Sequence, residues 1–133
     1  MSKNIGNTIY DRSINYYETD QMGIVHHSNY IRYFEEARLD MMEQVGLSYT
    51  AMEEHGLIIP VLSVACEYIK PVLFGEKVQI HTRLVKFDGI KMQFVYEIYC
   101  EGELRTKGES RHCFLDKEMK PVRMKRQFPE IYQ

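Results

Sequence analysis

The sequence lacks several features that define whole classes of proteins. None of its apolar runs approaches the roughly 18 residues that a transmembrane helix needs, so we expect no membrane span. The first 13 residues contain no apolar segment of the kind found in secretory signals, so we expect a cytoplasmic protein. The 17 basic and 19 acidic side chains nearly cancel, and the net charge of −2 gives no basic excess for binding nucleic acid.

Cysteine and the common catalytic motifs are equally sparse. The three cysteines form no CxxC pair and each falls in a strand-like run, which favours packed thiols over disulfides. The five histidines are scattered, without an HExxH motif or a Cys–His cluster, so we expect no metal site. GxSxG, Walker A and GxGxxG motifs are also absent, and we expect no cofactor.

What remains is a normal globular composition of 133 residues, with 44% hydrophobic and 27% charged side chains. No internal repeat, linker or low-complexity segment divides the chain. The length therefore predicts one domain that spans residues 1–133.

Alternating apolar and polar residues predict five strands, over residues 8–16, 60–70, 76–87, 91–100 and 104–115. In the first strand the alternation places Tyr10, Ile14 and Tyr16 on one face. Asp88-Gly89 is a strong hairpin signal between two of the later strands. Short connections of this kind imply antiparallel pairing.

Between the first two strands the period changes to that of a helix over residues 28–45. One helical stripe contains Tyr30, Tyr33, Phe34, Ala37, Met41 and Val45. Ser28 is expected to cap the start of this helix and Gly46 to end it, and a short second helix is expected over 48–55, ending near Gly56. The element order predicts an α+β fold in which a five-stranded antiparallel sheet wraps around one long central helix.

The most informative stretch runs from Tyr17 to Arg38. Asp20 stands seven to eight residues before the long helix, and Gly23 allows the intervening loop a positive φ or a close approach. The start of a helix presents unpaired amides that can bind a developing oxyanion. A carboxylate beside such amides suits hydrolysis of an activated carbonyl, with Asp20 as a nucleophile or as a base that deprotonates water.

Two simpler interpretations stand beside this one. A loop aspartate such as Asp20 often accepts hydrogen bonds from its own backbone and serves only the turn. His26 and His27 precede the helix, where one imidazole could orient water or substrate. Because neighbours in an extended segment point to opposite sides, we expect only one of the two to face a site.

This stretch resembles the signature of the hotdog-fold 4-hydroxybenzoyl-CoA thioesterase family, and especially the branch of Tol–Pal-associated acyl-CoA thioesterases. The matching motifs are Thr19-Asp20, Gly23-Ile24-Val25, His26-His27, Asn29-Tyr30 and Glu35-Glu36-Ala37-Arg38, followed by Glu67-Tyr68, Pro71 and Gly75-Glu76. The resemblance covers nearly the whole chain, and its order of elements agrees with the order predicted above.

The resemblance implies an acyl-CoA thioesterase with Asp20 as the catalytic carboxylate and with the backbone amide of His27 polarising the thioester carbonyl. It implies substrate-binding positions at Gly23, Val25, His26, Asn29, Tyr30 and Ser63, the last from a neighbouring subunit. Relatives often have an aromatic residue at the position of His26, so the preference for the acyl group stays open. Dimers joined edge to edge, often paired into tetramers, are also implied, with the site at the subunit boundary.

Several points remain alternatives. The chain could be a non-catalytic module that binds acyl-CoA or acyl carrier protein on the same fold, whereas a hydratase is disfavoured because a D-x-N-x-x-H pattern is absent. Apolar residues that could line an acyl tunnel, or simply form the core, are Tyr33, Phe34, Met41, Met42, Met92 and Phe94. Cations that could meet the phosphates of coenzyme A are Lys70, Lys86, Lys91, Arg123, Lys125 and Arg126.

Overall fold

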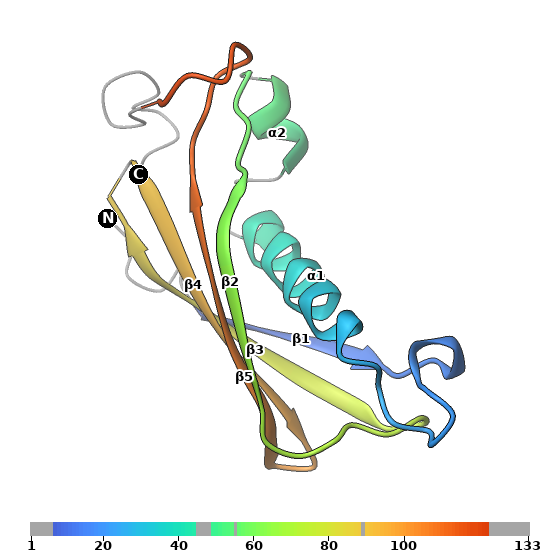
Figure 1. Cartoon of the computed structure of the whole chain (residues 1–133). Coiled ribbons are helices and arrows are strands. Elements are labelled where there is room, and N and C mark those ends of the chain that lie inside the picture. The colour runs from blue at the N-terminus through green and yellow to red at the C-terminus, as the bar shows by residue number, and fades with distance from the viewer. Residues whose placement is uncertain (1–6, 45–48, 55, 89, 123–133) are drawn as a thin grey trace.

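A five-stranded antiparallel sheet bends around one long helix in the computed structural model, which describes residues 7–44, 49–54, 56–88 and 90–122 (Figure 1). The predicted combination of sheet and helix is therefore confirmed. The elements are β1 (Asn7–Ser13), the 3₁₀ turn η2 (Tyr16–Glu18), α1 (Ser28–Gln44), α2 (Tyr49–Glu54), β2 (Val61–Tyr68), β3 (Lys77–Phe87), β4 (Lys91–Cys100) and β5 (Glu103–Cys113).

The strands lie in the order β1-β3-β4-β5-β2, so β1 and β2 form the two edges. Consecutive hairpins join β3, β4 and β5, and the first of them is the hairpin that Asp88-Gly89 predicted. At the first of these hairpins the Asp88 carboxylate accepts the amides of Ile90 and Lys91, at 2.9 and 2.8 Å, while Gly89 lies outside the described residues. The edge strands pair away from their neighbours in sequence, β1 with β3 and β2 with β5.

The first strand ends earlier than its alternation predicted. β1 stops at Ser13, and Asn15 caps the start of η2, where the Glu18 side chain accepts the Asn15 amide in a capping box. Tyr16 therefore leaves the strand and is 73% exposed rather than packed beside Tyr10. The local cap overrides a periodicity that continues in the sequence for three more residues.

The helical stripe is buried as predicted from Tyr30 to Met41, with each side chain no more than 3% exposed. Val45 and Gly46, the predicted end of this helix, lie outside the described residues. The short α2 is followed by Gly56, which ends the helix as expected. Its φ is 77°, and its amide donates a hydrogen bond to the Glu53 carbonyl. The predicted tunnel candidates Tyr33, Phe34, Met41, Met42, Met92 and Phe94 all belong to the core cluster.

The Phe34 side chain of α1 reaches the sheet at Gly108 of β5. The ring of Phe34 lies where a Cβ at position 108 would stand, and the same ring stacks on Tyr96 with centroids 4.5 Å apart. Glycine is required here by space, because its φ is not in the positive region. The contact sets the depth at which α1 sits in the concave face of the sheet.

Replacing Gly108 by alanine is expected to destabilise the fold by about 1–3 kcal/mol, because the added methyl overlaps the Phe34 ring. Denaturant unfolding measures the change. The double variant Gly108→Ala/Phe34→Leu should lose less unfolding free energy than the sum of the losses in the two single variants. A Gly108→Ala protein as stable as the wild type would show that α1 is not held at this depth by the contact.

Candidate functional site

Asp20 opens a tight turn that ends at Ile24. Its Oδ1 accepts the amides of Met22 at 2.8 Å and Ile24 at 3.3 Å, so the turn-forming role of a loop aspartate is real in this structure. The main chain closes the same turn, with the Asp20 amide donating to the Ile24 carbonyl and the Gly23 amide to the Asp20 carbonyl. The second oxygen, Oδ2, has no hydrogen-bond partner within the described residues.

Gly23 supplies the backbone conformation that this turn needs. Its φ is 75°, and a Cβ added there would meet no atom within 4 Å. The glycine is therefore required by conformation and not by space. Its carbonyl accepts the amide of Phe74, and Val25 donates to Val72, so the turn is docked on the segment that follows β2.

The start of α1 has fewer free amides than a generic helix. The Ser28 amide donates to the His26 Nδ1 at 3.2 Å, and those of Asn29 and Tyr30 donate to the carbonyls of His26 and His27. Ser28 was predicted to be the cap, but it is the first helical residue, and its hydroxyl bonds the His26 ring instead. Within residues 7–44, 49–54, 56–88 and 90–122 the His27 amide has no acceptor.

Asp20 and the start of the helix line one groove of about 380 Å³. Its walls are Asp20, Ile24, Val25, His26, His27 and Tyr30 on one side and Tyr68, Ile69, Lys70 and Pro71 on the other. Both histidines line it, with their rings stacked at 4.3 Å, so the expectation that only one could face a site is wrong. That expectation assumed an extended segment, whereas the chain turns into the helix at this point.

The wall from the end of β2 is aromatic and basic. Tyr68 packs edge-on against Tyr30 with centroids 5.0 Å apart, and its hydroxyl lies 3.4 Å from the His27 carbonyl. Partial burial and the neighbouring Cys66 raise the pKa of Tyr68 to about 12, so the phenol stays protonated at neutral pH. Lys70 lies in the groove as well, paired with Glu103 at 2.6 Å and still more than half exposed.

Three of the predicted site residues do not line the groove. Gly23 shapes the turn, and the Asn29 side chain donates to the Glu18 carbonyl at 2.9 Å, which ties the helix start to the loop. Ser63 lies on the edge strand β2 opposite Arg111, outside the lining of the groove within one chain. Four lining residues were not predicted as site residues, and most of them come from the far wall: Ile24, Tyr68, Ile69 and Pro71. Ile24, Tyr68 and Pro71 belong to the matching motifs, but the motifs alone assign them no role.

A second turn in the chain has the same hydrogen bonds as the Asp20 turn. Asp116 Oδ1 accepts the amides of Glu118 at 2.8 Å and Lys120 at 3.0 Å, and the Asp116 amide donates to the Lys120 carbonyl. Met119, with a φ of 64°, stands where Gly23 stands in the first turn. Asp116 lines none of the hollows described here, so the two turns differ in their surroundings and not in their own geometry.

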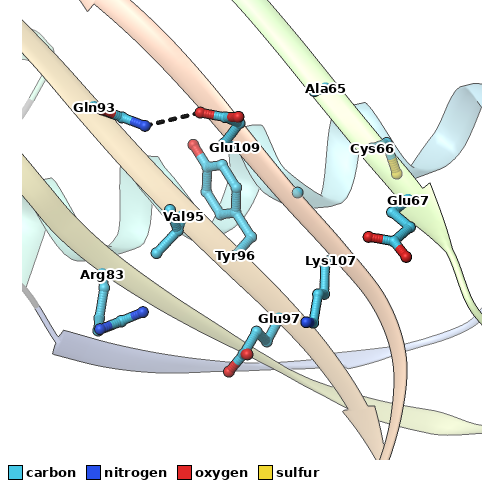
Figure 2. Close-up of a pocket in the computed structure, with 11 residues that line it drawn as sticks. Ala65, Cys66, Glu67, Arg83, Gln93, Val95, Tyr96, Glu97, Lys107 and Glu109 are labelled. Carbon is cyan, nitrogen blue, oxygen red and sulfur yellow. Dashed lines mark hydrogen bonds between the residues drawn. The ribbon is translucent and has the colours of Figure 1, made fainter.

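A different hollow, of about 420 Å³, opens on the face of the sheet away from α1 (Figure 2). Charged side chains of both signs border it, and Gln93 donates to Glu109 across neighbouring strands at 2.8 Å. No predicted site residue contributes to it. We therefore place the candidate site in the groove beside Asp20.

The described residues contain no candidate metal centre and no disulfide. No group of three or more His, Cys, Asp or Glu side chains there is arranged to hold a metal ion. Cys66, Cys100 and Cys113 are free thiols, and burial raises the pKa of Cys100. None of the helices in this part of the chain is both long and apolar enough to cross a membrane.

Comparison with known proteins places this geometry in a family. Residues 14–131 match the family described as the thioesterase-like superfamily. YneP of Bacillus subtilis, provisionally named an acyl-CoA thioesterase, is 39% identical over 119 residues, which cover 88% of this chain and 86% of the relative. The acyl-CoA thioester hydrolase YbgC of Escherichia coli is 28% identical over 83% of this chain and 81% of its own length.

Solved structures agree with the family match. The DHNA-CoA thioesterase from Staphylococcus aureus superposes with a TM-score of 0.88 at 37% identity, over 93% of this chain and 85% of that one. A hypothetical protein from Aquifex aeolicus gives 0.87 at 35% identity, over 95% and 99%. The predicted hotdog fold is thereby confirmed, and the chain belongs to the thioesterase-like superfamily and is an enzyme of the thioesterase class.

Proposed function

We propose that this enzyme hydrolyses acyl-CoA thioesters to the free acid and coenzyme A in the groove beside Asp20. The observation that supports this most directly is the presence, in one groove, of a carboxylate with one oxygen held by two amides and of a helix-start amide without an acceptor. The held oxygen fixes the side chain, and the other is available for chemistry. The His27 amide donates to the thioester oxygen as negative charge develops on it.

Asp20 can act in two ways, as a nucleophile or as a general base, and each accounts for complete hydrolysis of the thioester. As a nucleophile, its free oxygen attacks the carbonyl carbon, the thiolate leaves, and water then hydrolyses the mixed anhydride. As a base, it takes a proton from water, the resulting hydroxide adds to the carbonyl, and the tetrahedral intermediate expels the thiolate. A thiolate whose conjugate acid has a pKa of about 8.5 leaves without a strong general acid, so a groove without such a group suffices.

Other groups of the groove have supporting roles in this proposal. His26 holds the helix start through Nδ1, and the buried Tyr30 and Val25 line the groove. Gly23 and Asn29 lie outside the lining and keep the turn in place. Lys70 is the candidate for the phosphates of coenzyme A within the described residues, because it is exposed beside the groove. Arg123, Lys125 and Arg126 lie outside the described residues.

We further propose that the enzyme is a homodimer joined through β2. On its outer side this edge strand pairs with no other strand of the described residues, and Val61, Leu62, Val64 and Tyr68 on it are 42–53% exposed. An apolar open edge is prone to pair with another strand, and a closed two-fold dimer satisfies it. Because the far wall of the groove continues from β2, the dimer seam would border the site, and Ser63 would belong to that seam.

Other expectations stay predictions at a finer level. They are membership of the Tol–Pal-associated branch, the pairing of dimers into tetramers, the cytoplasmic location and the choice between coenzyme A and acyl carrier protein as donor. The non-catalytic binding module is the competing function, and the following experiment separates it from hydrolysis.

Replacing Asp20 by asparagine is expected to lower turnover roughly 10²–10⁴-fold, because the attacking or proton-accepting group is removed while the turn keeps an acceptor oxygen. A thiol reagent follows the release of coenzyme A from a panel of aliphatic and aromatic acyl-CoAs.

Asp116→Asn is the matched control, because it makes the same change in the same kind of turn away from the groove, and it should leave turnover unchanged. Wild-type turnover in a folded Asp20→Asn protein would refute the mechanism. Tight binding of acyl-CoA by the wild type without any thiol release would favour the binding module.

The substitution Val64→Lys is expected to convert the dimer to a monomer, because it places a charge in the proposed β2 seam. Sedimentation velocity measures the mass, and Ile9→Lys on the opposite edge strand, also exposed, is the control that should remain dimeric. A wild-type monomer at micromolar concentration, or loss of the dimer in Ile9→Lys alone, would contradict pairing through β2.

A further inference from the structure

A cluster of charged side chains lies directly behind the Asp20 loop, and the mechanism above does not use it. Arg12 on β1 contacts both oxygens of Glu18, at 2.8 and 2.6 Å, and both oxygens of Glu36 on α1, at 2.9 and 3.0 Å. The Arg12 side chain is 16% exposed, and both glutamates hold its pKa above the ordinary value. One guanidinium thus connects the strand, the loop and the helix.

Glu18 is the most enclosed member of this cluster, at 4% exposure. Burial alone would raise the pKa of its carboxyl, but Arg12, the Asn15 amide and the Tyr33 hydroxyl donate to it, and its pKa falls below the usual range. The carboxylate therefore stays ionised with both oxygens satisfied. A buried ion pair of this kind has a defined geometry because every partner is in place.

The main chain of Glu18 connects this cluster to the two reacting groups. Its carbonyl accepts the His26 amide and the Asn29 side chain, both at 2.9 Å. Glu18 stands two residues before Asp20, and His26 stands one residue before His27. A shift of Glu18 therefore moves the loop that holds the carboxylate relative to the helix start that presents the free amide.

We propose that Arg12, Glu18 and Glu36 are positioning residues that fix the separation between the Asp20 carboxylate and the His27 amide. We name these three side chains the Arg12 cluster, and their proposed role rests on the proposed function. A displacement of about 1 Å between reacting groups can cost roughly 10²-fold in rate. The cluster then affects kcat and leaves substrate affinity nearly unchanged, since none of its side chains lines the groove.

The test compares Glu18→Gln with the wild type in kcat and KM, at a temperature well below the unfolding midpoint of each protein. We expect kcat to fall at least tenfold and KM to change less than twofold, because glutamine keeps the size of the side chain but weakens its bonds to Arg12. Arg12→Lys should give an intermediate loss, since lysine keeps the charge but cannot contact two carboxylates in the planar geometry of arginine. Glu109→Gln, on the outer face of the sheet, is the matched control and should leave kcat unchanged.

A merely structural role is distinguished by the double variant. If Glu18 acts through Asp20, then Glu18→Gln should reduce the residual rate of Asp20→Asn no further, whereas an independent defect would multiply with it. A kcat for folded Glu18→Gln equal to that of the wild type overturns the positioning role, and so does a loss that only follows the folded fraction. Wild-type turnover in Asp20→Asn would instead refute the proposed mechanism and leave the geometry of the Arg12 cluster untouched.

Discussion

The packing of the Phe34 ring of α1 onto Gly108 of β5 is the constraint on which the rest of the molecule depends. At Gly108 the sheet has no side chain, and the Phe34 ring fills that space and stacks on Tyr96. With the helix held at this depth, its first turn reaches the end of β2, where Tyr30 meets Tyr68. The groove exists because these two elements, which are far apart in the chain, are brought to the same place.

Apolar packing sets the position of α1, and polar contacts then fix the Asp20 turn relative to it. Backbone hydrogen bonds dock the Asp20 turn on residues 72–74, and the Glu18 carbonyl joins that loop to the helix start. The Arg12 cluster joins β1, the loop and α1 beside this junction and adds directional bonds. Precision at the site comes from these bonds, whereas the position of the helix comes from the core.

The sequence predicted the elements well wherever one face is buried. Residues 91–100 were predicted with the observed bounds of β4, because the buried Met92, Phe94, Tyr96 and Ile98 alternate with half-buried neighbours. The end of β1 was mispredicted, since the capping box at Asn15 competes with an alternation that continues to Tyr16. Pairing of β2 with β5 is a long-range choice that no local pattern encodes.

The candidate site was predictable on one side only. The loop and the helix start are contiguous in sequence, so Asp20, His26 and His27 could be placed together, whereas Tyr68 and Pro71 reach the groove through the tertiary fold. Glu18 resembles any loop acid in the sequence, because its partners Arg12 and Tyr33 come from β1 and α1.

The near-identity of the turns at Asp20 and Asp116 has a consequence for how this position is interpreted. In each turn one oxygen accepts two amides, a task that the neutral amide of asparagine can also perform. Folding at position 20 thus demands an acceptor and not an anion. The negative charge there is surplus to the architecture, and its purpose must be sought in whatever molecule enters beside it.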